Sequence, residues 1–386
     1  MGEGVVVSVL VLAAGSFTII GASATAPLIK DSFDLSEVGV GAIASVAFLG
    51  ALLTSPLGGR LADRWGPAPL ILAGLLCLCV GSVVAGLSWT AGVFYVGILV
   101  VGGGYGAMNP ATTVLSNPAR ARRRGLIMSI KQSGVPVGGI LAGAVLPTLG
   151  LTFGWRWGFA LTMAVSLVIA AGIAARGGYH ARTAKPEGAA HRPHQRMRLP
   201  FGLAFGLVIA GVQVSMFAFT ALYLVQARDF TAAAAGLGVS TLLLGGLAGR
   251  PFWGWLSDVV TQHRLRVLEG IGLLGATTIV ALALVPDELV PILLFLLGGC
   301  SAGWNGVYIA VVAESADPGS VGWTMGAAHA LINVGAMLFP VAIGAIVGWT
   351  GSWVVGLFVL GALSAAATLV AAIASEDVPD FDEAPT

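Results

Sequence analysis

Twelve apolar stretches of about 20 residues run through this 386-residue chain, and they constrain its fold more than any other feature. A helix needs roughly 20 apolar residues to cross the hydrocarbon core of a bilayer. Apart from closed barrels, only helices satisfy their own backbone groups in lipid. The sequence therefore predicts an all-α integral membrane protein with twelve transmembrane helices. The expected spans are 5–28, 38–58, 69–89, 92–116, 125–149, 156–175, 200–225, 235–257, 267–285, 290–313, 323–347 and 353–374.

The composition excludes several classes of protein. Hydrophobic residues make up 57% of the chain and charged residues only 10%, so lipid must cover much of its surface. The net charge of +1 gives no overall attraction to nucleic acid. Cys77, Cys79 and Cys300 lie within apolar runs, and His191 and His194 lie in a polar segment, so we expect no metal site and no cofactor. Because no cluster of catalytic side chains is present, we expect a protein that is not an enzyme.

Basic residues fix the expected orientation in the membrane. Fourteen of the 19 Lys and Arg residues fall in the second, fourth, sixth, eighth and tenth connections, whereas Lys30, Arg156 and Arg228 lie on the opposite side. Cytoplasmic loops carry the excess of basic residues, so both termini should lie in the cytoplasm of a multi-pass cell-membrane protein. Residues 176–199 are basic and rich in Pro, Gly and His, which favours a cytoplasmic linker. The acidic residues of 376–386 predict a solvated tail.

The two halves of the chain repeat one another. Shifting the first half by 195 to 197 residues superposes polar residues and glycines in matching places. This duplication predicts two pseudo-symmetric six-helix bundles, residues 1–175 and 200–375. The matching pairs include Asp34/Asp229, Gly59/Gly254, Asp63/Asp258, Asn109/Asn305 and Gly125/Gly322.

A short motif follows the second span. Residues 58–66 read GGRLADRWG, and a degenerate copy, GWLSD at 254–258, is followed by Arg264. The first motif resembles the signature loop between helices two and three of the major facilitator superfamily, and with the twelve-span repeat the resemblance covers essentially the whole chain. It implies two bundles that rock about a central cleft and so move a solute by alternating access.

The same resemblance implies roles for the loop residues. In that family the aspartate of the loop caps the facing helix eleven, and the arginine tightens the cytoplasmic gate. A carboxylate near the positive end of a helix that begins around Gly322 is stabilised by about 0.3 to 1 kcal/mol, which agrees with capping. The expected gate residues are Gly59, Arg60, Asp63, Arg64 and Asp258.

Two cations lie inside predicted spans. Lys131 should sit about 9 Å into helix five, and Arg250 about 12 Å from Asp258 along helix eight. No acidic residue lies near the middle of any span, although His329 still offers a titratable group. The resemblance implies that helices five and eight lie side by side, so the two cations are expected to share an anionic ligand. The alternative is that both side chains snorkel toward the headgroups.

Other polar residues lie near span centres and should face the bundle interior, because a buried amide exposed to lipid costs several kcal/mol. Helix-to-helix hydrogen bonding explains each of them as well as substrate binding does. The full set of substrate-binding candidates is Lys131, Gln132, Arg250, Asn109, Asn305, Gln213, Tyr308, His329 and Asn333.

Three functions follow from these features. The preferred hypothesis is a secondary active or facilitative transporter of a small organic or inorganic anion, similar to the cyanate and monocarboxylate branches of the superfamily. The alternative is a drug or metabolite efflux antiporter, suggested by Gly134, Pro136 and Gly138 in helix five, although close helix packing also explains these residues. The third is a membrane sensor that keeps the scaffold without transporting a solute. The expected partners are the lipid bilayer and a small anionic molecule, and we expect a monomer.

Overall fold

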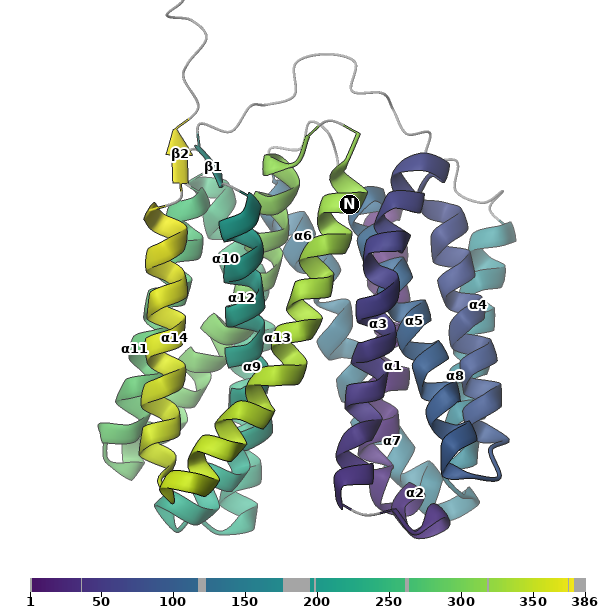
Figure 1. Ribbon diagram of the computed structural model, residues 1–386, viewed down its shortest axis with the longest axis horizontal. Helices are drawn as coiled ribbons and strands as arrows, with labels where there is room; N and C mark the ends of the chain where they lie inside the picture. The colour runs from purple at the N-terminus through teal and green to yellow at the C-terminus, as the bar shows by residue number, and fades with distance from the viewer. Residues whose placement is uncertain are drawn as a thin grey trace, which may run out of the picture. The chain divides into compact units, whose positions relative to one another are not determined.

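The structure is a computed structural model that describes residues 2–35, 37–116, 123–175, 195–197, 199–260, 264–317, 319–373 and 375–377. Helices account for nearly all of these residues (Figure 1). The helices are α1 (Glu3–Ala24), α2 (Ala26–Phe33), α3 (Glu37–Trp65), α4 (Pro67–Gly86), α5 (Ala91–Ser116), α6 (Arg124–Gln132), α7 (Gly134–Phe153), α8 (Arg156–Ala175), α9 (Leu199–Arg228), α10 (Ala232–Val259), α11 (Arg264–Leu284), α12 (Val290–Ser315), α13 (Val321–Thr350) and α14 (Trp353–Ile373). The predicted all-α membrane fold is confirmed.

Eleven spans of the described chain are long and apolar enough to cross a bilayer. Helices α6 and α7 form one of them, Arg124–Phe153, which is 30 residues long. The one remaining predicted span, the eighth, corresponds to α10, which has 28 residues and carries Arg250 in its second half. The order of the helices along the chain therefore follows the predicted order of the twelve spans.

Two of the predicted spans differ from single helices. The fifth is interrupted at Ser133, where the Ser133 N–H donates to the Ile130 carbonyl three residues earlier. Pro136 explains the break, since it has no N–H to donate to the carbonyl of Gln132, four residues before it. The first span ends at Ala24, and the chain continues as the short helix α2.

Two short strands join segments that are far apart in the sequence. Strand β1 (Gln195–Met197) pairs antiparallel with β2 (Ser375–Asp377), with Arg196 opposite Glu376. Strand β1 lies within the predicted linker, and β2 overlaps the start of the predicted tail. Most of residues 176–199 and 376–386 lie outside the described residues. Backbone pairing in these two segments was not expected from their composition.

The chain forms two compact units. The first comprises Met1–Asn117, Ile130–Glu187 and Asp317–Asn333, and the second comprises Pro118–Ser129, Gly188–Ala316 and Val334–Thr386. The division places the start of α13 with the first unit and most of α6 with the second. The predicted bundle boundaries, residues 1–175 and 200–375, stay a prediction.

Within each unit, glycines bring helix backbones into direct contact. In the first unit α3 packs along α5, and a Cβ on Gly102 would meet the backbone carbonyl of Ala47. In the second unit α10 packs along α12, and a Cβ on Gly298 would meet the carbonyl of Leu242. Gly102 and Gly298 are repeat partners, so the same close approach recurs in both halves.

The repeat is also visible in backbone conformation. Asp34 and Asp229 have φ angles of 50° and 54°, and among the described residues they are the two non-glycine positions with positive φ. Aspartate tolerates this left-handed region better than most residues, because its short polar side chain can hydrogen-bond locally. Asp34 ends α2 and Asp229 follows α9, so these repeat partners both have a positive φ at the end of matching segments.

Candidate functional site

Asp63 caps the start of α13 within the first unit. Its Oδ1 accepts a hydrogen bond from the Gly322 N–H at 2.7 Å, and its Oδ2 accepts one from the Trp323 N–H at 2.8 Å. The first N–H groups of a helix have no partner within the helix, so a carboxylate that takes two of them stabilises the helix end. The cap has the geometry that the loop motif implies.

The neighbouring motif residues contact the same helix end. The Arg60 guanidinium lies 3.7 Å from the centre of the Trp323 ring, a cation–π contact. A Cβ on Gly59 would meet the Gly322 carbonyl, so this position needs a residue without a side chain. Arg64 is exposed. Sequence reasoning missed Trp323, although its place directly after the capped Gly322 marks it.

Asp258 repeats the cap in the second unit. Its two carboxylate oxygens accept from the Gly125 N–H at 2.7 Å and the Leu126 N–H at 2.8 Å, at the start of α6. Gly125 is the repeat partner of Gly322, so the two aspartates occupy equivalent places in the duplicated structure. A Cβ on Gly254, the partner of Gly59, would lie 2.8 Å from the Gly125 carbonyl.

The second cap belongs to a network of ion pairs. Arg264 pairs with Asp258 at 2.8 Å and also with Glu314, and Glu314 pairs with Arg124 at 3.3 Å. For Asp63 the described residues provide no such ion pair. Sequence reasoning did not identify Glu314 or Arg124, because a single carboxylate near a helix end does not indicate which loop it faces.

Lys131 is the buried cation of the first unit. Its side chain is 0% exposed, and its Nζ lies 2.6 Å from the Thr113 hydroxyl of α5. Among the residues that the structure describes, no carboxylate pairs with it. Sequence reasoning missed Thr113, which lies one helical turn after Asn109 on the same helix.

Further predicted residues are buried in this unit. Asn109, Gln132, His329 and Asn333 are between 4% and 8% exposed. The Oδ1 of Asn109 has no hydrogen-bond partner in the described part of the chain. The His329 Nδ1 lies 2.8 Å from the carbonyl of Met325 on its own helix. The first unit therefore buries four of the predicted binding residues besides Lys131, three of them amides.

Arg250 is the buried cation of the second unit. It lies in α10 and is 6% exposed. Asn305, on α12, is partly buried. Lys131 and Arg250 belong to different units.

Gln213 has a fixed orientation in the second unit. Its Oε1 accepts a hydrogen bond from the Trp304 indole N–H at 2.9 Å. The indole nitrogen is only a donor, so the atom it contacts must be the amide oxygen, and the amide NH₂ of Gln213 keeps its two donor hydrogens for other partners. Trp304 itself packs on Tyr308, with ring centres 5.1 Å apart. A Cβ on Gly206 would meet the Tyr308 hydroxyl.

Trp304→Phe is predicted to weaken substrate binding without breaking the aromatic cluster. Phenylalanine keeps the ring but removes the N–H, so Gln213 can rotate its amide and lose its donor geometry. One neutral hydrogen bond contributes about 0.5 to 1.5 kcal/mol, so KM for a substrate that Gln213 contacts should rise roughly three- to tenfold. Trp89→Phe is the matched control, because Trp89 is 77% exposed. An unchanged KM in Trp304→Phe would exclude a role for this contact.

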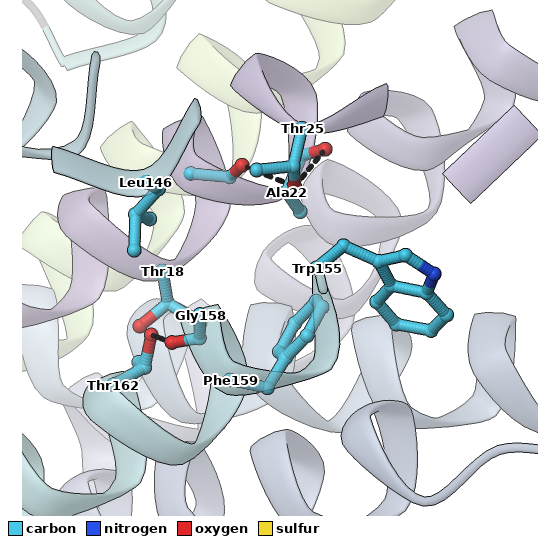
Figure 2. A pocket seen from close by; sticks show the side chains of 9 residues that line it. Thr18, Ala22, Thr25, Leu146, Trp155, Gly158, Phe159 and Thr162 are labelled. Carbon is cyan, nitrogen blue, oxygen red and sulfur yellow. Dashed lines mark hydrogen bonds between the residues drawn. The ribbon is translucent and has the colours of Figure 1, made fainter. Parts of the chain in front are cut away.

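A small pocket lies among α1, α7 and α8 of the first unit (Figure 2). Its volume is about 10 Å³, enough for a single water molecule. Thr18, Thr25 and Thr162 line it, and each donates its hydroxyl to the carbonyl four residues earlier in the chain. None of the predicted binding residues lines it, so we do not assign a substrate to this pocket.

The comparisons with known proteins agree on one family. The model of the Major Facilitator Superfamily matches residues 6–201 and 201–385. The hexuronate transporter of Bacillus subtilis is 24% identical over 90% of this chain and 88% of its own length. The gentisate transporter of Corynebacterium glutamicum is 24% identical over 82% of this chain and 74% of its own length.

Other relatives match in part or in fold. The 3-(3-hydroxy-phenyl)propionate transporter of Escherichia coli is 30% identical over 36% of this chain and 35% of its own length. The E. coli fucose:proton symporter has a TM-score of 0.73 at 14% identity and covers 97% of this chain and 100% of its own. A human organic anion transporter has a TM-score of 0.72 at 14% identity, with 96% and 100% covered. These solved structures establish the fold.

Proposed function

Because the chain belongs to the major facilitator superfamily and is a multi-pass membrane transporter, we propose that it carries a small organic anion by alternating access. Lys131 and Arg250 are the proposed cationic ligands, one in each compact unit. The amides and the other polar residues predicted from the sequence are proposed to orient the substrate around these two charges.

One observation carries the proposal: Lys131 is fully buried, and in the described chain its Nζ contacts a neutral hydroxyl. A charged side chain at such a depth costs at least about 2.5 to 3.5 kcal/mol unless it is paired or hydrated. Full burial and the bond to Thr113 argue against a side chain that reaches the headgroups. A transported anion would supply the missing negative charge in the loaded state.

The names of the relatives favour the same class of substrate. Hexuronate, gentisate and 3-(3-hydroxyphenyl)propionate are all carboxylates, and they are the named substrates of proteins similar to this chain. A carboxylate is also the group that lysine, arginine and amide donors recognise together. These names support an organic carboxylate over an inorganic anion.

The two capping aspartates are proposed to hold the cytoplasmic gate closed. Asp63 with Gly59, Arg60 and Arg64 would act at the start of α13, and Asp258 would act at the start of α6. Each aspartate would have to release its helix end when the gate opens. Opening would therefore break two hydrogen bonds of Asp63 and two of Asp258. The cytoplasmic side, the cell membrane and the monomeric state remain predictions from the sequence.

Uptake into proteoliposomes tests the proposed function. The purified protein is reconstituted and assayed for saturable counterflow of labelled glucuronate, gentisate and 3-(3-hydroxyphenyl)propionate, with fucose as a neutral control and ethidium as a lipophilic cation. We expect flux of at least one carboxylate, a large loss in Arg250→Gln, and partial activity in Arg250→Lys. Transport of ethidium alone would favour the efflux alternative, and equal carboxylate flux in Arg250→Gln would contradict this site.

A further inference from the structure

Asn109 carries a buried hydrogen-bond acceptor that lacks a donor. The residue lies on α5, and its side chain is 6% exposed. In the part of the chain that the structure describes, its amide oxygen Oδ1 is buried and has no hydrogen-bond partner. Buried polar atoms in proteins are normally paired, because an unpaired one loses its bond to water and gains nothing in return. This oxygen therefore needs a donor that the described residues do not supply.

The buried cation of the first unit contacts the same face of α5. Thr113 follows Asn109 by four residues, so their Cβ atoms are neighbours on the helix surface, about 5 to 6 Å apart. The Thr113 hydroxyl accepts a hydrogen bond from Lys131 Nζ at 2.6 Å and donates one to the Asn109 backbone carbonyl at 3.5 Å. An ammonium group has three N–H donors, so two remain for a ligand. The donors of Lys131 and the acceptor of Asn109 thus lie at adjacent turns of α5.

A simple carboxylate cannot satisfy both of these groups. An ionised carboxylate only accepts hydrogen bonds, so it would pair with Lys131 and leave the Asn109 oxygen without a donor. An ammonium group on the substrate would supply a donor, but the positive charge of Lys131 would repel it. A hydroxyl group donates a hydrogen bond without adding charge. A substrate that has a hydroxyl close to its carboxyl group therefore matches both residues.

We propose that the substrate is a hydroxycarboxylate, and that Asn109 Oδ1 accepts a hydrogen bond from its hydroxyl while Lys131 binds its carboxylate. The inference rests on the proposed function and narrows its substrate class. It makes Asn109 the residue that distinguishes hydroxy acids from unsubstituted acids. A site that hydrogen-bonds a substrate hydroxyl rejects the analogue without that hydroxyl, because the polar group of the site is then left unpaired.

Competition against anion exchange tests this specificity. Strongly buffered proteoliposomes exchange labelled glucuronate, or otherwise the carboxylate with the largest saturable exchange above that of protein-free vesicles. Unlabelled acids then compete in pairs that differ by a single hydroxyl, lactate against propionate and mandelate against phenylacetate. The measured quantity is the concentration of each acid that halves the exchange rate. We expect each hydroxy acid to compete at a concentration about tenfold lower than its partner, the effect of a single hydrogen bond.

Asn109→Leu removes the acceptor and keeps the shape of the side chain. The hydroxy acids should become about tenfold weaker competitors, whereas propionate and phenylacetate should compete as they do in the wild-type protein, which also shows that the variant has folded. Asn109→Gln retains the amide on a longer side chain and should keep part of the preference. Ser82→Ala is the matched control, because Ser82 is a buried residue of the first unit whose hydroxyl has no partner among the described residues. It should leave all four concentrations unchanged.

Three results would overturn this inference while leaving the proposed function intact. The first is equal competition, or none, within both pairs in the wild-type protein, a comparison that needs no variant. The second is a preference for hydroxy acids that persists in Asn109→Leu. The third is an equal loss for both members of each pair, which would assign Asn109 to the carboxylate or to helix packing. Absence of saturable exchange of any carboxylate by the wild-type protein would instead overturn the proposed function, and the substrate class with it.

Discussion

Lys131→Met is expected to lower anion uptake about 100-fold and to raise the thermal stability of the substrate-free protein. Methionine has nearly the volume of lysine, so packing around Thr113 changes little. Loss of a buried charged contact to the substrate costs about 2 to 5 kcal/mol, and about 3 kcal/mol corresponds to a 100-fold loss. Removing an unneutralised buried charge should stabilise the empty protein by about 1 to 3 kcal/mol.

Two measurements separate these effects. Initial uptake rates in proteoliposomes report the function, and thermal unfolding in detergent reports the stability of the empty protein. Lys131→Arg is the control that retains the charge, and it should keep more uptake than Lys131→Met. A fall in both stability and uptake in Lys131→Met would indicate that Lys131 is a structural residue, which would contradict its assignment as a ligand.

Asp258→Ala is expected to be the most destabilising of the cap variants. It removes two hydrogen bonds to the start of α6 and leaves Arg264 beside Arg124 with Glu314 as their shared partner. The side chains of Asp258 and Arg264 are only 6% and 7% exposed, so water screens them weakly. Removing one partner of a buried ion pair typically lowers stability by about 3 to 5 kcal/mol.

Asp63→Ala provides the matched comparison within the same chain. It removes the equivalent cap from α13, but Asp63 has no ion pair among the described residues, so the cost should be only about 1 to 2 kcal/mol. Thermal unfolding of both variants measures the difference. Equal losses would show that the network around Arg264 adds nothing beyond the cap.

The sequence was sufficient to predict the membrane spans and the repeat, because each has a strong local cause. Runs of about 20 apolar residues specify spans whatever they pack against. The repeat was visible in aspartates, and the structure shows why these residues mark it. Asp34 and Asp229 both have a positive φ, and Asp63 and Asp258 cap helices at the repeat partners Gly322 and Gly125.

The pairing of side chains across helices was not predictable in the same way. Which residue of α5 faces Lys131 depends on how the helices rotate about their axes, and helices that are apolar on every side give little indication of their rotation. The contacts of Lys131 with Thr113 and of Gln213 with Trp304 therefore appear only in the structure. The interruption at Ser133 has a local cause in the sequence, because Pro136 lacks the N–H that would bond to the Gln132 carbonyl.

The pairing of β1 with β2 has a practical consequence for experiments that express this protein as two separate polypeptides. Residues 195–197 precede the second half of the chain in sequence, but their backbone partners are residues 375–377. A second polypeptide that begins at residue 200 would lose the strand that pairs with its own carboxyl-terminal segment. Dividing the gene before codon 195 keeps the two strands in one product.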